Sequence, residues 1–88
     1  MGTRLDFSMV RILGEDCRAV DGGHELALTA YVAQVDGDRL VEHAAVARVT
    51  ETFAGWDPQD YQRANLKLHR ALAARVAELA LAARREEG

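Results

Sequence analysis

The fold is decided by residues 57–85, which read DPQDYQRANLKLHRALAARVAELALAARR. Asp57 can cap a helix, and Pro58 suits the first helical position because its φ is fixed. Asp60 places a carboxylate in the first turn, where the backbone dipole favours negative charge. Strong helix formers fill the remainder, without proline or glycine. The sequence therefore predicts a helix over 58–85.

One face of this helix is apolar. A rotation of about 100° per residue gathers one stripe of side chains, which are Tyr61, Ala64, Leu68, Leu72, Val76, Leu79 and Ala83. We expect this stripe to cover the core, and Trp56 to pack against Tyr61 as a hydrophobic staple. A helix of about 28 residues is roughly 42 Å long, whereas a strand of about ten residues spans roughly 33 Å. The last helical turns are therefore expected to overhang the sheet.

Alternation of apolar and polar residues predicts three strands before the helix. The strands are 4–13, 24–35 and 38–53. Residues 14–23 are rich in glycine and acids, so we expect them to form the longest and most mobile loop. The dipeptide Asp36-Gly37 favours a two-residue type I′ hairpin turn. The predicted fold class is α+β, a three-stranded antiparallel β-meander (β-β-β-α) with one long C-terminal helix packed on one face. It forms a single domain over 1–88.

That turn also predicts the register of the second and third strands. It places His43 opposite Ala30 on an otherwise apolar face, which should receive the helix. On the other face, Glu25 would lie beside Arg48 as a favourable charge pair.

The face away from the helix also carries apolar residues. They are Ala27, Tyr31, Ala33, Val35, Leu40, Ala44 and Val46. A monomer rarely leaves so much apolar surface in water. A chain of 88 residues is also near the size at which burial only just offsets chain entropy. We therefore expect a homodimer or a higher homo-oligomer.

Composition excludes some classes of protein. Hydrophobic residues make up 49% and charged residues 28% of the chain, as in ordinary globular domains. No apolar run has the length of a membrane span and the N-terminus has no secretory pattern, so we expect a cytoplasmic protein without membrane association. The single Cys17 excludes an internal disulfide.

Charge is distributed unevenly along the chain. Residues 1–60 hold 11 acids and 5 bases, whereas residues 61–88 hold 3 acids and 6 bases. Opposite signs on sheet and helix could direct association between copies. A net charge of −3 does not favour nucleic-acid binding.

No catalytic residue, metal site or cofactor is predicted, and the chain is not expected to be an enzyme. Three residues are candidates for a small-ligand pocket between helix and sheet, namely His43, Tyr31 and Arg75. His43 is the polar exception on the predicted core face, where a general base or ligand is one interpretation and a histidine bonded to a carbonyl is the other. Arg75 projects near the apolar seam and needs an acid, which a partner's sheet could supply.

Two groups of charged residues have simpler interpretations than binding sites. Acids are expected at one end of the sheet, namely Glu15, Asp16, Asp21, Glu51, Asp57 and Asp60. They lack the spacing of a calcium loop and are interpreted as solvated or capping residues. Arg63, Lys67 and Arg70 form a basic stripe on the outer helix face. Without an aromatic platform or glycine-rich loop, this stripe suggests a solvated face or a protein contact.

Residues 40–49, LVEHAAVARV, and residues 70–79, RALAARVAEL, carry a family resemblance. They resemble the β-β-β-α half of transporter auxiliary lipoproteins, and equally a family of small dimeric proteins of unknown role. The resemblance consists of strand alternation and an Ala/Leu-rich helix. It implies the fold and no function.

The sequence thus favours a non-enzymatic, homo-oligomeric protein-interaction or structural module. Its interface candidates are Ala27, Tyr31, Val35, Leu40, Val46, Leu66, Ala77 and Leu81. The alternative is a small-ligand-binding protein or small enzyme with a pocket near His43. A third hypothesis is nucleic-acid binding through the basic helix stripe.

Overall fold

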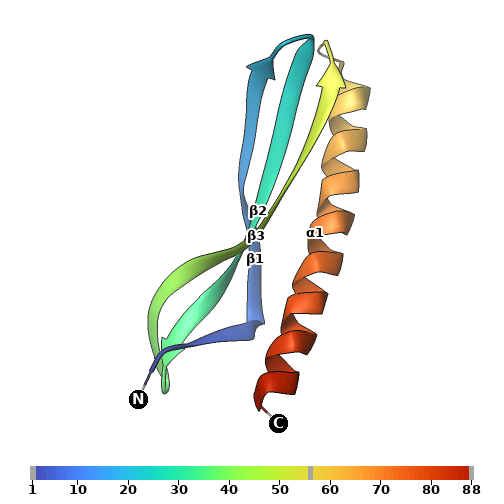
Figure 1. The fold of residues 1–88 in the computed structure, drawn as a ribbon. Helices are drawn as coiled ribbons and strands as arrows, with labels where there is room; N and C mark the ends of the chain where they lie inside the picture. The colour runs from blue at the N-terminus through green and yellow to red at the C-terminus, as the bar shows by residue number, and fades with distance from the viewer. Residues whose placement is uncertain (1, 56, 88) are drawn as a thin grey trace.

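The chain forms three antiparallel strands and one long helix in a computed structural model that describes residues 2–55 and 57–87. The elements are β1 (Arg4–Val20), β2 (Gly23–Asp36), β3 (Arg39–Ala54) and α1 (Pro58–Glu87). The central strand β2 pairs with β1 on one side and β3 on the other, and α1 runs along one face of the sheet (Figure 1). The predicted α+β class is confirmed.

The helix begins where the capping pattern predicts. The Asp57 carboxylate accepts a hydrogen bond from the Gln59 backbone N–H at 2.8 Å, which satisfies a donor that the first helical turn leaves without a partner. The Tyr61 N–H donates to the Asp57 carbonyl at 3.0 Å. The predicted staple rests on Trp56, which lies outside the described residues.

β1 continues far beyond the predicted strand end. Instead of a loop over 14–23, the chain stays extended to Val20 and turns at Asp21-Gly22, with Val20 paired to Gly23. Gly22 has a φ of 82°, which suits the second central position of a type II turn. The loop prediction is wrong because β1 is an edge strand. Its polar side chains face solvent, so this part of the strand has no apolar alternation to reveal it.

The predicted register between β2 and β3 is also wrong. The turn lies at Gly37-Asp38 rather than Asp36-Gly37, and Gly37 has a φ of 62°, as the first position of a type II′ turn requires. Two irregularities then shift the pairing further, one near Val41 and one near Val46. A bulge inserts an extra residue in one strand, so each shift changes which residues face each other.

These shifts change the partners of the charged and polar residues that the sequence paired. His43 lies opposite Ala33 instead of Ala30, which puts it on the face away from α1. Glu25 lies opposite Thr52 on β3, and Arg48 lies opposite Thr29. The ion pair of Glu25 is with Arg18 on β1, where Nε and Oε1 are 3.0 Å apart.

The core lies between α1 and the first half of β2. Its buried members are Leu26, Leu28, Ala30, Ala64, Leu68, Leu72 and Val76. The helix members belong to the stripe that the sequence predicts. Tyr61 packs against this core, as do the partly buried Val46 and Ala47 of β3.

The predicted apolar sheet face away from the helix is largely covered within one protomer. Ala27 is 2% exposed and Ala33 is 1% exposed, because each lies on the central strand between side chains of both neighbours. Val35 is buried as well, and Val46 packs on the core because of its bulge. The prediction of a continuous apolar outer face is therefore wrong, and exposed apolar surface has to be sought elsewhere.

Helix and sheet have similar lengths but diverge. The 30 residues of α1 span about 45 Å and the 14 residues of β2 about 46 Å, so the predicted overhang is wrong. The sheet instead twists away from the helix toward the β2–β3 turn (Figure 1). We call this end, with the start of β1 and the last turns of α1, the open end. The closed end holds Gly23, Ala54 and the first turns of α1.

Candidate functional site at the open end

Exposed apolar side chains of the sheet gather at the open end. Within the described sheet, the large apolar residues that are exposed come from the first half of β1 and the start of β3. They are Leu5, Met9, Val10, Leu40 and Val41. The exposed fraction is 38% for Leu5 and 50% for Leu40. Arg4 of β1 pairs with Val35 of β2, and Val35 pairs on its other side with Leu40 of β3. Both groups therefore lie at the same end of the sheet.

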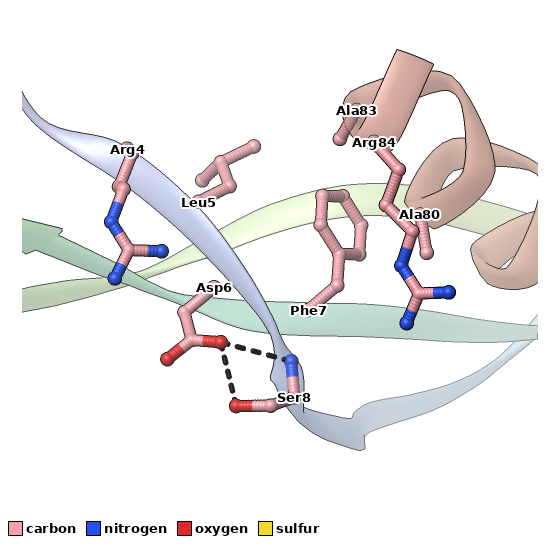
Figure 2. Close-up of a pocket in the computed structure, with 8 residues that line it drawn as sticks. All are labelled: Arg4, Leu5, Asp6, Phe7, Ser8, Ala80, Ala83 and Arg84. Carbon is pink, nitrogen blue, oxygen red and sulfur yellow. Dashed lines mark hydrogen bonds between the residues drawn. The ribbon is translucent and has the colours of Figure 1, made fainter. Parts of the chain in front are cut away.

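A bulge in β1 shapes this region. Asp6 pairs with Ala33 and Val10 pairs with Val32, so residues 7–9 have no partner on β2. The Asp6 carboxylate accepts hydrogen bonds from the Ser8 hydroxyl at 2.6 Å and from the Ser8 N–H at 3.0 Å, which fixes the bulge (Figure 2). These bonds, helped by the charge of Arg4, lower the pKa of Asp6 below its ordinary 3.8.

A cleft of about 250 Å³ opens between the bulge and the end of α1. It is lined by Arg4, Leu5, Asp6, Phe7, Ser8, Ala80, Ala83 and Arg84. Figure 2 shows Phe7 pointing from β1 toward α1, with Arg84 beside it on the helix and Arg4 farther along the strand. The cleft thus has an apolar wall of Phe7 and Ala80, and its lining also holds two cationic side chains and the Asp6 carboxylate. Its volume is below the roughly 300–1,000 Å³ of small-molecule pockets.

The β2–β3 hairpin projects from the same end. Asp36 pairs with Arg39 next to the turn, and Leu40 lies opposite Val35. Val41 falls at the register shift and has no partner on β2, and it is 50% exposed like its neighbour Leu40. Asp36 and Asp38 are exposed beside them. The hairpin therefore presents two aliphatic side chains beside two carboxylates.

The closed end is tied together by aromatic and polar contacts. His24 lies 2.6 Å through Nδ1 from the Gly55 carbonyl oxygen and stacks on Phe53, with ring centroids 5.7 Å apart. Phe53 in turn meets the edge of Tyr61 on α1. Lys67 of α1 donates to Glu51 of β3 at 3.2 Å. These contacts join β2, β3 and α1 where the chain passes from sheet to helix.

The predicted ligand-binding residues do not meet in a pocket between helix and sheet. His43 is exposed and Tyr31 is partly buried, and both lie on the face away from α1. Arg75 is on the helix, where its guanidinium donates to Glu78 one turn later at 3.1 Å. The acidic partner of Arg75 is therefore Glu78 of the same helix, rather than a residue of a partner's sheet.

The predicted interface residues fall into two groups. Ala27, Val35 and Val46 are covered by their own protomer, and Tyr31 is partly buried. The exposed group is Leu40, Leu66, Ala77 and Leu81. Of these, Leu40 lies at the open end of the sheet, while Leu66, at 55% exposure, lies on the solvent side of α1 near its beginning.

Several charged side chains have partners within the protomer. Arg63 lies 3.5 Å from Asp60, and Lys67 bonds Glu51, so the basic stripe is partly neutralised. Glu15 accepts a hydrogen bond from Asn65 of α1 at 3.3 Å. In the chain that the structure describes, no group of three or more His, Cys, Asp or Glu side chains is placed to hold a metal ion.

Sequence reasoning missed the cleft residues, above all Phe7, Ala80 and Arg84. The sequence contains one local indication of the bulge. An Asp followed two residues later by Ser favours a side-chain to backbone hydrogen bond that interrupts a strand. Nothing in the sequence indicates that the end of α1 lies beside this bulge, since that depends on the twist of the whole sheet.

Comparison of the chain with protein-family models, curated proteins and solved structures finds no match. Within residues 2–55 and 57–87, no helix is long and apolar enough to cross a membrane.

Proposed function

We propose that the protein is a small non-enzymatic interaction module that acts as a homodimer. The observation that carries this proposal is the surface of a single protomer. It exposes 6230 Å² for a mass of 9.7 kDa, about 1,100 Å² more than the roughly 5,100 Å² expected of a compact monomer. A standard protein interface covers about 800 Å² on each partner. One interface of ordinary size would therefore bring this chain near the expected value.

The shape of the protomer supports the same proposal. Its radius of gyration is 15.6 Å and its extents are 49 × 23 × 18 Å, whereas a compact chain of this length has a radius of roughly 12 Å. The excess surface includes the exposed aliphatic residues of the open end, such as Leu40 and Val41. Exposed apolar groups that lie together are typical of surfaces that a partner covers. A cytoplasmic location is part of this proposal.

The other two hypotheses receive less support from the geometry. A ligand pocket near His43 would need this residue to face α1, but it faces the other way. Nucleic-acid binding would need the basic stripe to be available, but Lys67 and Arg63 lie beside Glu51 and Asp60. We therefore retain the interaction module as the single proposal.

Sedimentation velocity and native mass spectrometry at micromolar concentration test the proposal. We expect a species with the mass of two chains, which dissociates reversibly on dilution and does not grow into larger aggregates. A chain that stays monomeric throughout the micromolar range would contradict the proposed function. A self-limited dimer is also distinguishable from non-specific aggregation, because its mass does not rise further with concentration.

A further inference from the structure

We propose that two copies dock open end to open end, with the β2–β3 hairpin of each seated in the cleft of the other. This inference rests on the proposed dimer and adds the surface through which it forms. It makes Leu40 and Val41 the apolar anchors, and Arg4 and Arg84 the partners of the hairpin carboxylates.

The apolar parts of the two surfaces match. Leu40 and Val41 are consecutive, and each is 50% exposed. The cleft offers Leu5, Phe7 and Ala80 as its apolar lining. At about 250 Å³ it suits a few inserted side chains better than a separate ligand of drug-like size. Burial of apolar surface is the dominant favourable contribution to most protein association, so two such anchors can dominate a small interface.

The charges of the two surfaces are opposite in sign. The hairpin exposes Asp36, Asp38 and Arg39, a net charge of −1 from two acids and one base, whereas the cleft is lined by Arg4, Arg84 and Asp6, a net charge of +1 from two bases and one acid. In the described part of one protomer, Asp36, Asp38, Arg4 and Arg84 take part in no ion pair. Docking a hairpin in the partner's cleft would bring acids next to arginines, which favours this orientation and disfavours cleft against cleft.

Each protomer carries both the hairpin and the cleft at one end, so a two-fold axis makes every contact twice. Such an interface is isologous and closes at two copies, in contrast to a head-to-tail contact that continues into a filament. The two hairpin contacts together also use the region in which the protomer's exposed sheet residues are concentrated. Other apolar positions such as Leu66 would remain at the surface.

The first experiment compares Leu40→Ser/Val41→Ser with Leu66→Ser by sedimentation. All three side chains are at least half exposed, so the folded protomer should survive, which circular dichroism checks. We expect the hairpin variant to raise the dimer Kd by roughly 10- to 100-fold and Leu66→Ser to leave it unchanged. A wild-type dimer that Leu66→Ser dissociates and the hairpin variant does not would overturn this inference, while the proposed function would stand.

The second experiment uses charge reversal and does not depend on apolar packing. One chain carries Asp36→Lys/Asp38→Lys and the other carries Arg4→Glu/Arg84→Glu. Each charge-reversed chain on its own would place like charges in both contacts of its homodimer, so its homodimer should be weaker than that of the wild type. When the two chains are mixed, both contacts of the heterodimer become attractive, so native mass spectrometry should show mainly heterodimer. A statistical mixture of homo- and heterodimers would overturn the inference, and a wild-type monomer would overturn the proposed function with it.

Discussion

The two ends of this molecule differ in how much of the sheet the helix covers. At the closed end the chain passes from β3 to α1, and Phe53 stacks on His24 of the sheet and meets the edge of Tyr61 on the helix. At the open end the same sheet twists away from the same helix (Figure 1). This divergence leaves a cleft and exposed aliphatic side chains. The difference shows that a helix as long as its sheet covers only the part with which its axis stays aligned.

Sheet twist is the physical cause of this difference. Adjacent strands rotate by roughly 20–25° relative to one another, and bulges increase the local twist. Here both pairings contain bulges, and those next to residues 7–9 and Val41 lie at the open end. A straight helix cannot follow the curved surface, so the apolar contact between α1 and the sheet decreases toward Arg84. The local stability of α1 should therefore also decrease from the closed end toward the open end.

The largest expected effect contrasts two leucines of α1. Both lie on the apolar stripe, but Leu68 is 2% exposed against the core, whereas Leu79, nearer the open end, is only partly buried. Leu68→Ala should lower the free energy of unfolding by about 2–5 kcal/mol because it leaves a cavity. Leu79→Ala should lower it by less, about 1 kcal/mol, because part of this side chain already contacts water. Urea denaturation at one fixed protein concentration measures both, since dimer formation makes stability depend on concentration.

A similar loss for both leucines would contradict the contrast between the ends. It would mean that the last turns of α1 are covered as well as its first turns, either by the sheet or by a second copy. Repeating the measurement at several protein concentrations separates these cases, because only cover by a second copy changes with concentration.

The second prediction concerns the cap that anchors the helix at the closed end. Asp57→Ala removes the acceptor of the Gln59 N–H and should cost about 0.5–2 kcal/mol. The matched control is Asp60→Asn, which keeps the cap and removes only a first-turn charge and an exposed contact with Arg63. Its effect should be smaller, because exposed ion pairs contribute little. Equal losses would show that first-turn charge, rather than the cap, stabilises the helix start.

The closed end was largely predictable from sequence. Asp57, Pro58 and the apolar stripe around Leu68 and Leu72 act locally or with the 3.6-residue period, so they are visible in the chain itself. The α+β class followed from these elements and the strand alternation. The order of the strands followed from the short connections between them.

The open end could not be predicted in the same way. Register depends on where each turn places its glycine and on bulges, and a shift of one residue exchanges the faces of a strand. That is why His43 was expected under the helix and lies on the opposite face. Residues 14–20 gave no strand pattern because an edge strand can be polar on both sides. The cleft depends on twist accumulated over all three strands, which no local pattern encodes.

The smallest expected effect is a titration shift at the open end. Hydrogen bonds from Ser8, with the charge of Arg4, hold the pKa of Asp6 below 3.8. A carboxyl with a lowered folded-state pKa adds stability that is present above its unfolded pKa and lost as pH falls through the folded one. The bulge should therefore loosen only below about pH 3.8. Because Asp6 lies near the surface, the pKa itself is the better readout.

Carbon-detected NMR of the Asp6 carboxyl can follow this titration in three proteins. The wild-type midpoint should lie below 3.8, and Ser8→Ala should raise it toward that value. Thr3→Ala is the matched control, because the Thr3 hydroxyl accepts a hydrogen bond from Gln34 and does not contact Asp6. If Ser8→Ala left the Asp6 midpoint in place, the Ser8 hydroxyl would not be what lowers the Asp6 pKa, and the backbone N–H of residue 8 would be the remaining bond to the carboxylate.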